Sequence, residues 1–333
     1  MPTDLALLPV PPTDLERAEE QVPLDPELLE RVDAFANASL SPATRRAYTK
    51  DWAAFRAWCL EKGRRALPAD PETVGAYLAV LADEGLRVAS IERALTSISS
   101  AHKLARFPSP RGVELVSKAM IGIAHSVGMP QVRKTALRPG SLGAMLSHIP
   151  PTLLGTRDRA LLLVGFCGGF RRSELVALDV SDLAFTEDGL EVLIRRSKTD
   201  QAGKGRKIGL PLGSTALRCP VRSVRAWFDA AGISTGPVFR GLFTRGKDTS
   251  ATERRLSDRA VARTVKRYAA LADLDPAVFS GHSLRAGLVT SAYKAQKSHD
   301  SIMAQTGHMS FDMVRRYIRD ASLFEDNAAA GLL

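Results

Sequence analysis

Two guanidiniums, two imidazoles and one phenol follow one another in the C-terminal half of the chain, at Arg171, His282, Arg285, His308 and Tyr317. Arginine makes bidentate contacts to phosphate oxygens and stays charged at every physiological pH. A histidine with a pKa near neutrality can accept a proton, and a phenol becomes a nucleophile once it is activated. Together these groups could hold a phosphodiester, move its protons and attack its phosphorus.

The local sequence around the two arginines favours a shared site. Arg171 lies in the segment 168–175, Gly-Gly-Phe-Arg-Arg-Ser-Glu-Leu, where a glycine pair precedes a predicted helix. His282 and Arg285 belong to the run His-Ser-Leu-Arg, so a helix would place them about one turn apart. Either arginine could instead pair with an acidic residue on its helix, a structural role that the sequence leaves open.

The histidine and the tyrosine near the C-terminal end complete the pattern. Gly307 permits a tight turn before His308, and Tyr317 follows within the basic run Arg-Arg-Tyr-Ile-Arg. With Arg171 and residues 282–285, this arrangement resembles the tyrosine recombinase (phage-type integrase) family. The layout of the whole chain is similar to that of the Cre-like members, although Cre has Trp where this chain has the family's commoner histidine.

The resemblance implies a role for each group. Tyr317 would attack the phosphorus, while Arg171 and Arg285 would hold the non-bridging oxygens and stabilise the charge that develops there. His282 would accept the phenolic proton, and His308 would hydrogen-bond the same phosphate. The product would be a 3′-phosphotyrosine that is resealed without ATP, metal or any other cofactor.

Two further assignments come from the same resemblance. Glu174 is similar to the family acid that supports the active-site network, and a plain capping or surface glutamate is the alternative. Lys198, in the loop Ser-Lys-Thr-Asp-Gln, resembles the lysine that gives a proton to the leaving oxygen. Lys204 and Lys207 compete with it for that role, and a solvated loop lysine is the structural alternative.

Neighbouring residues of the same types are less suited to these roles. The family pattern Gly-hydrophobic-Arg-x-Ser-Glu-Leu assigns the clamp to Arg171 rather than to Arg172. The other four tyrosines lie in apolar helical contexts or too close after Arg285: Tyr48, Tyr77, Tyr268 and Tyr293.

Other catalytic chemistries find little support. A metal site at His282, His299 and His308 has no carboxylate or cysteine to complete it, so we expect no metal. A serine hydrolase role for Ser283 is not supported either, because the residue has no Gly-x-Ser-x-Gly nucleophile elbow around it. The three scattered cysteines suit small buried hydrophobic positions in a reducing cytosol: Cys59, Cys167 and Cys219.

Charge is distributed unevenly along the 333 residues, whose net charge is +10. Residues 1–38 carry two Lys/Arg against nine Asp/Glu, a net of −7; residues 39–137 carry fifteen against eight, +7; residues 138–333 carry twenty-nine against nineteen, +10. Basic bodies attract polyanions, and duplex DNA is the usual one. The acidic leader is either solvated or a partner-docking segment. No apolar run approaches the ~18–20 residues of a membrane span, and we expect no secretory signal because the first residues lack a basic region followed by an apolar one.

The predicted fold is mainly helical and has four parts. An acidic leader covers 1–25, a helical core-binding (SAM-like) domain that binds DNA covers 26–128, a basic linker covers 129–138 and the catalytic domain covers 139–333. A short amphipathic helix is expected at 26–38. Longer helices are expected from Ser41-Pro42, from Asp70-Pro71 to Gly85, over 88–105 and over 112–127.

Basic residues of the first domain and the linker are the predicted phosphate contacts, although any one of them could be a plain surface charge. They are Arg45, Arg46, Lys50, Arg87, Arg93, Lys103, Arg133 and Lys134. The linker signature itself is Pro130 with basic residues and no apolar periodicity. In the family, such a strap lets two domains clamp the duplex.

The catalytic domain is predicted to be mostly helical with one small antiparallel sheet. A hairpin is expected from a strand at 190–196, a polar loop at 197–205 and a return strand at 206–212. Helices are expected over 140–148, 156–168, 172–178, 220–231, 256–273, 283–296, 299–306 and 311–319.

The apolar segment 321–333 has two interpretations. The resemblance implies a helix that docks into the next protomer of a homotetramer, and packing on its own domain is the alternative.

The chain is thus expected to be a cytoplasmic, nucleoid-associated recombinase of prokaryotic, phage or plasmid origin that joins two duplex sites through a Holliday junction. A single-site strand transferase, such as a telomere resolvase or type IB topoisomerase, and an inactive DNA-binding relative are the rivals. The target sequence, the direction of the reaction and any accessory protein are not encoded in these patterns.

Overall fold

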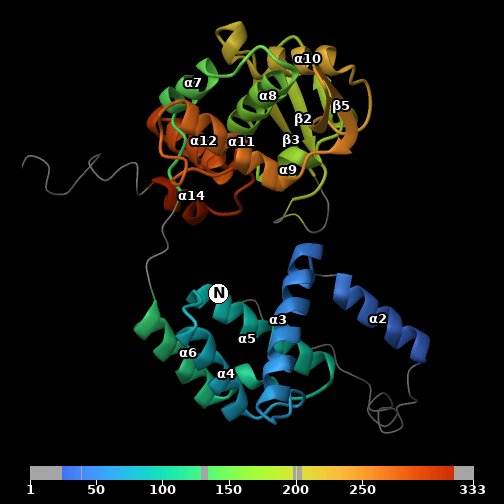
Figure 1. Cartoon of the computed structure of the whole chain (residues 1–333), viewed down its shortest axis with the longest axis vertical. Coiled ribbons are helices and arrows are strands. Elements are labelled where there is room, and N and C mark those ends of the chain that lie inside the picture. Colours follow the sequence, from blue (N-terminus) through green and yellow to red (C-terminus); the bar gives the residue numbers. More distant parts are fainter. Residues whose placement is uncertain (1–24, 39, 129–133, 198–199, 201–204, 319–333) are drawn as a thin grey trace, which may run out of the picture. The chain divides into compact units, whose positions relative to one another are not determined.

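The computed structural model of the protein describes residues 25–38, 40–128, 134–197, 200 and 205–318. The chain divides into two compact units, residues 1–131 and residues 132–333 (Figure 1). Helices predominate in the described part of both, and the strands form two small antiparallel sheets in the second unit. The predicted mainly helical fold with a small antiparallel sheet is confirmed, and a second small sheet accompanies the predicted one.

The described part of the first unit consists of helices, and two of them start at the predicted signals, Ser41-Pro42 and Asp70-Pro71. They are α2 (Pro26–Ala38), α3 (Pro42–Glu61), α4 (Pro71–Asp83), α5 (Val88–Leu104), the short 3₁₀ helix η1 (Pro110–Gly112) and α6 (Glu114–Val127). The Ser41 side chain accepts a hydrogen bond from the backbone N–H of Thr44, and the Asp70 side chain accepts one from Thr73. Each cap satisfies an N–H group that has no partner within its helix.

The core of this unit comes from one face each of α3, α4, α5 and α6, through Phe55, Leu78, Leu95 and Val116 among others. His102 is buried beside this core, where its Nδ1 lies 2.8 Å from the carbonyl oxygen of Ile98 and its Nε2 accepts from Ala69 N–H at 2.9 Å. The Nδ1 contact lies within α5 and orients the ring, and the Nε2 contact holds α5 to the loop before α4.

The second unit is built around α8 (Leu153–Cys167), in which every residue from Ala160 to Gly165 is buried. The other helices are α7 (Pro139–Ser147), α9 (Arg172–Ala177), α10 (Pro220–Ala231), α11 (Asp258–Leu271), α12 (His282–Lys294), α13 (His299–Thr306) and α14 (Phe311–Ile318), with the 3₁₀ helices η2 (Val180–Asp182) and η3 (Ala216–Arg218). Every predicted helix of this region is present, with ends that differ by a few residues.

The three-stranded sheet contains the predicted hairpin. Strand β2 (Gly189–Ile194) pairs antiparallel with β3 (Arg206–Pro211) on one side and with β1 (Leu183–Phe185) on the other. Leu190, Val192 and Ile194 of β2 are buried, and so are Ile208 and Leu210 of β3, as alternation requires. Strand β1 was not predicted because its three residues are too few to show a period.

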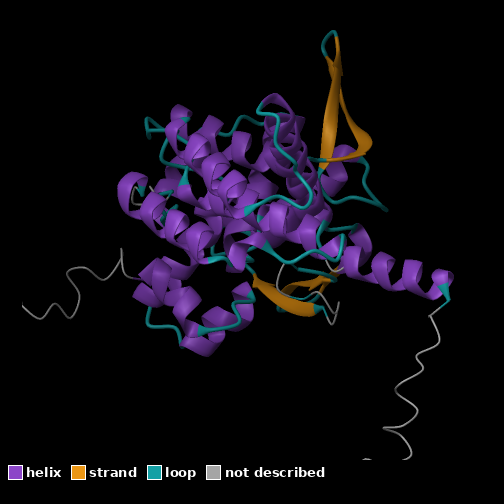
Figure 2. Cartoon of the chain, turned by 90° about the horizontal axis from the view of Figure 1, so that it is seen from below, coloured by secondary structure: helices purple, strands orange, loops and turns teal. Residues whose placement is uncertain are grey.

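The second sheet is a hairpin of β4 (Arg240–Arg245) and β5 (Asp248–Arg255), and it was not predicted. Most of its residues are exposed, and it extends away from the helices around it (Figure 2). The sequence therefore lacks the alternation of buried and exposed residues that identifies a half-buried strand. At its base, Arg255 donates to the carbonyl oxygens of Val176 and Leu178.

A small separate cluster of apolar side chains holds the last three helices of the unit together. Val289 of α12, Ile302 of α13, and Val314 and Ile318 of α14 are buried against one another, and the Tyr317 ring packs at their edge. This cluster fixes α14 on α12 and so determines where Tyr317 lies. Over the residues described here, none of the helices is both long enough and apolar enough to span a membrane.

Candidate active site

Arg171 lies at the junction between α8 and α9, next to a buried carboxylate. The turn requires Gly169, whose φ is +57°, in the left-handed region that other residues rarely adopt. The Glu174 side chain is almost completely buried, and its Oε1 accepts from Arg171 Nη1 at 2.6 Å. Its Oε2 accepts from the Arg171 backbone N–H at 2.9 Å. Glu174 thus fixes both the backbone and the guanidinium of Arg171.

Arg172 points elsewhere, although it is adjacent in sequence. Its guanidinium lies 3.8 Å from an Asp258 carboxylate oxygen on α11 and is partly exposed. Its aliphatic stem passes against Gly281, where an added Cβ would lie 2.5 Å from Arg172 Cδ. The geometry therefore separates these two neighbouring arginines: Arg171 is held on Glu174, and Arg172 lies near Asp258.

Arg285 is a buried cation that bonds only to neutral groups among the described residues. It is 1% exposed. Its Nη1 donates to the carbonyl oxygens of Gly169 at 2.7 Å and Thr306 at 2.5 Å, and its Nη2 lies 2.8 Å from His308 Nε2. Burial, followed by the positive charge of Arg171, lowers the pKa of Arg285 to about 10. A buried guanidinium without a carboxylate is suited to an incoming anion.

His308 is a neutral imidazole with a defined tautomer. Because Arg285 can only donate, His308 Nε2 accepts, so the proton is on Nδ1. Nδ1 then donates at 2.7 Å to the Thr306 hydroxyl, which itself donates to the Ile302 carbonyl at 2.6 Å. Burial, followed by the charges of Arg285 and other cations, lowers the pKa of His308 to about 3.

Tyr317 and His282 meet across the α12–α14 contact of the same chain. The Tyr317 hydroxyl lies 2.9 Å from His282 Nε2. The phenol ring is tilted against both imidazoles, with centroids 5.6 Å from His282 and 5.5 Å from His308. Burial, then the positive charges of Arg285, Arg172 and Arg171, lowers the pKa of His282. A neutral His282 is able to accept the phenolic proton.

A third guanidinium, Arg206 of β3, belongs to the same cluster and was not predicted. Its Nη2 lies 3.3 Å from Glu174 Oε2, and its Nη1 donates to the Gln305 carbonyl at 3.2 Å. In the sequence Arg206 is one of several basic residues after a polar loop, and no motif distinguishes it. With Arg171, Arg206 and Arg285 against Glu174, these four groups carry a net charge of +2, which suits a phosphodiester.

Of the three lysines considered for the general-acid role, the structure describes only Lys207. Lys198 and Lys204 lie outside the described residues. Lys207 is exposed on β3 and lies 3.2 Å from the Glu191 carboxylate on β2. Because Lys207 lies on the face of β3 opposite Arg206, which contacts Glu174, the geometry argues against Lys207 as the general acid. Lys198 in that role stays a prediction.

The predicted DNA contacts of the first unit differ in their surroundings. Five of them are exposed: Arg45, Arg46, Lys50, Arg87 and Lys103. Arg93 instead makes a two-point ion pair with Asp51, with nitrogen–oxygen distances of 2.7 and 3.1 Å. In the linker, Lys134 donates to the Ala277 carbonyl, while Arg133 lies outside the described residues, as does the segment 321–333.

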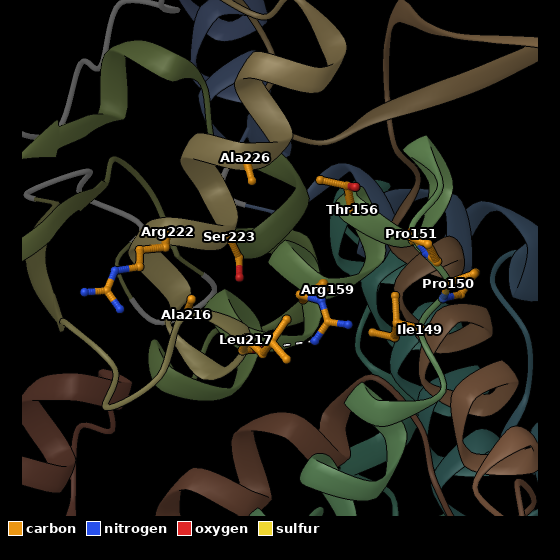
Figure 3. A pocket seen from close by; sticks show the side chains of 11 residues that line it. Ile149, Pro150, Pro151, Thr156, Arg159, Ala216, Leu217, Arg222, Ser223 and Ala226 are labelled. Carbon is orange, nitrogen blue, oxygen red and sulfur yellow. Dashed lines mark hydrogen bonds between the residues drawn. The ribbon is translucent and has the colours of Figure 1, made fainter.

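A surface pocket of about 510 Å³ lies elsewhere in the second unit, between α8, α10 and η3 (Figure 3). Arg159 extends along it and donates to the Leu217 carbonyl at 3.2 Å, while the Arg222 side chain points away. None of the catalytic candidates that the structure describes lines this pocket. The candidate active site is therefore defined by a cluster of charged and aromatic side chains and not by this cavity.

The model of the Phage integrase family matches residues 136–323, and that of the Phage integrase, N-terminal SAM-like domain matches residues 33–107. An "Integrase/recombinase xerD homolog" of Selenomonas ruminantium is 40% identical over 289 residues, which cover 86% of this chain and 84% of that protein. "Recombinase cre" of Escherichia phage P1 is 27% identical over 287 residues, 81% of each chain. A lambda integrase tetramer bound to a Holliday junction superimposes with a TM-score of 0.58 and 21% identity over 88% of this chain and 76% of that chain, which shows a shared fold.

Proposed function

Since this chain belongs to the phage integrase family, whose tyrosine recombinases are site-specific DNA strand transferases, we propose that it cleaves and rejoins DNA through a 3′-phosphotyrosine at Tyr317. The observation that carries the proposal is the hydrogen bond between the Tyr317 hydroxyl and His282 Nε2, made within one chain beside Arg285 and His308. A tyrosine with a structural role alone has no need of a proton acceptor, a buried cation and a second imidazole around it.

In the proposed reaction, His282 takes the proton of the Tyr317 hydroxyl as its oxygen attacks phosphorus. Arg171 and Arg285 bind the non-bridging oxygens, and charge stabilisation of this kind is usually the largest single contribution to such a barrier. The P–O bond to Tyr317 forms as the P–O5′ bond breaks, and Lys198 gives a proton to the leaving 5′-oxygen. One phosphoester replaces another, so the reverse step rejoins DNA without ATP or a cofactor.

We further propose the assembly in which this chemistry operates. The substrate is double-stranded DNA held by the first unit and the linker, and the complex is a homotetramer on two sites, joined through the segment 321–333, that passes through a Holliday junction. The similarity to the lambda integrase tetramer supports this arrangement. The compartment would be the cytoplasm, at the nucleoid. The target sequence and the choice among integration, excision and resolution are properties of the DNA partners.

The inactive DNA-binding alternative is less consistent with the site. A protein that only binds DNA has no use for a buried Arg285, a neutral His308 and a phenol in contact with His282. The single-site strand transferase shares the same chemistry and differs only in assembly. Counting protomers on one and on two target sites would separate that alternative from the tetramer.

Covalent trapping tests the proposal. Duplexes that bind the protein are first selected from a randomised pool, then resynthesised with a nick moved one nucleotide at a time across the selected site. In a chelating buffer, the wild type should form an adduct that survives denaturation, and Tyr317→Phe should bind the same duplex without forming one. If the wild type binds these duplexes but forms no adduct at any of the nick positions tested, the result would favour the inactive DNA-binding protein.

A further inference from the structure

We propose that Arg206 is a positioning residue of the active site, whose guanidinium holds Glu174 against Arg171 and supports the turn that presents His308. The inference rests on the proposed function of the site and adds a third arginine to it. Arg206 is not offered as a phosphate ligand. Its effect is transmitted through the two elements that it joins.

Its place in β3 directs Arg206 toward the interior. Residues 206, 208 and 210 share one face of the strand, and Ile208 and Leu210 on that face are buried. Lys207 points to the other face, where it is exposed and pairs with Glu191. Two adjacent basic residues therefore have opposite surroundings, which makes Lys207 a matched control for Arg206.

The guanidinium of Arg206 connects two elements that carry catalytic candidates. Nη2 lies 3.3 Å from Glu174 Oε2, the same oxygen that accepts the Arg171 backbone N–H. Nη1 donates to the carbonyl oxygen of Gln305 in α13 at 3.2 Å. Arg206 thus spans from α9 to α13, and Glu174 is held by one cation on each side.

The contact with the α13–α14 turn is close enough to fix it. Gly307 has a φ of +66°, and a Cβ added there would lie 2.5 Å from Arg206 Nη1 and 2.7 Å from Cζ. The guanidinium therefore occupies the space beside Gly307, immediately before His308. A displacement of Arg206 would release this turn and the imidazole that follows it.

Folding stability does not explain why an arginine stands at this position. Among the described residues, the buried Arg206 Nε has no hydrogen-bond partner, a costly arrangement. Burial also lowers the pKa of Arg206, and Glu174 already has a partner in Arg171. An unfavourable buried cation at the edge of an active site is consistent with a role in the reaction.

The test compares Arg206→Met, Arg206→Lys and Lys207→Met on the nicked duplexes used to trap the wild type. Single-turnover cleavage is measured at saturating protein, together with the Kd for the duplex and the melting temperature. Misplacement of reacting groups by about 1 Å lowers rates on the order of 100-fold. We expect that loss for Arg206→Met with Kd and melting temperature unchanged, partial recovery in Arg206→Lys and wild-type cleavage in Lys207→Met.

Two further measurements separate positioning from contact with the phosphate. If Arg206 acts through Glu174, the effects of Arg206→Met and Glu174→Gln on the rate should be less than additive. A neutral methylphosphonate at the scissile position should not restore the cleavage rate of Arg206→Met, because the contact that this variant lacks is not a contact to the phosphate.

The outcomes are distinguishable. Wild-type cleavage by Arg206→Met, fully additive effects, or rescue by methylphosphonate would each overturn the positioning role while leaving the proposed function standing. Failure of wild type and Lys207→Met to cleave any bound duplex would overturn the proposed function, and this inference with it.

Discussion

Substitution of Arg285 should distinguish a functional role from a structural one, because the two roles predict different effects on cleavage and on stability. Its side chain is 1% exposed, and its partners are two carbonyl oxygens and an imidazole nitrogen. A folded protein gains little from such a cation, because none of the described carboxylates bonds to it and its desolvation is only partly offset. We predict that Arg285→Met strongly slows cleavage while leaving the free energy of unfolding nearly unchanged.

The magnitude follows from the structure. The fall of the Arg285 pKa from 12.5 to about 10 corresponds to about 3 kcal/mol against the charged form in the folded state. That penalty is present at every pH below about 10, so Arg285→Met relieves it at pH 7. The substitution also leaves three acceptors without this donor, at about 1 kcal/mol each. The two effects nearly cancel, and the net change should be smaller than about 2 kcal/mol. Removing one charge-stabilising group should slow cleavage by roughly 10²–10³-fold.

Arg157 is the control for this experiment. It is also buried, but its Nε and Nη2 lie 3.1 and 2.7 Å from Oδ1 of the fully buried Asp158. Arg157→Met should lose about 3–5 kcal/mol of stability, while the folded fraction cleaves normally. Urea unfolding and single-turnover cleavage are measured for both variants. If Arg285→Met unfolds as readily as Arg157→Met and its folded fraction still cleaves, Arg285 is structural and the reasoning is wrong.

Two further predictions concern pH and salt. The pKa of His308 is about 3 in the folded protein and near 6.5 when unfolded, so the unfolded state binds more protons between these values. The contribution of neutral His308 to the free energy of unfolding should be fully present above pH 6.5 and should fall by up to about 5 kcal/mol toward pH 3. Urea unfolding of wild type and His308→Asn over this pH range checks this. An equal pH dependence of the free energy of unfolding in the two proteins would contradict it. Lys50→Ala should reduce the log–log salt dependence of DNA binding by about one, whereas Arg93→Ala should change it less because Arg93 is paired with Asp51. Equal changes in salt dependence for the two variants would show that the ion pair opens on DNA.

The predictable part of the fold is the part with strong local signals. Ser41 and Asp70 mark helix starts in the sequence, and both cap their helices in the structure. The β2–β3 hairpin is predictable because a strand-like segment precedes a polar loop and a second segment returns after it, and in the structure buried residues alternate in both strands. The β4–β5 hairpin was not, since an exposed two-stranded ribbon carries no apolar period and its fixed base depends on contacts such as Arg255 with Val176.

The candidate site likewise contains residues that a sequence motif identifies and one residue that no motif identifies. Arg171, Arg285, His282 and Tyr317 could be selected because types and spacing coincide in one motif, and the structure brings them together. Arg206 could not, because its partners are far away in sequence and only the folded chain places it beside Glu174.

Two properties of single residues were also not predictable from the sequence. Whether a basic residue is paired depends on the neighbouring helix, so Arg93 could not be distinguished from Lys50. The tautomer of His308 depends on Arg285 and Thr306, which are held by tertiary contacts.

The most direct test of the account is to identify the atom that joins protein to DNA. Wild-type adducts formed on the selected nicked duplexes are digested with nuclease and protease, and the nucleotide-bearing peptide is sequenced by mass spectrometry. The account predicts that the nucleotide is attached through its 3′-phosphate to Tyr317, whose hydroxyl already contacts His282. Attachment through another residue, or through a 5′-phosphate, would contradict the mechanism even if recombination occurred.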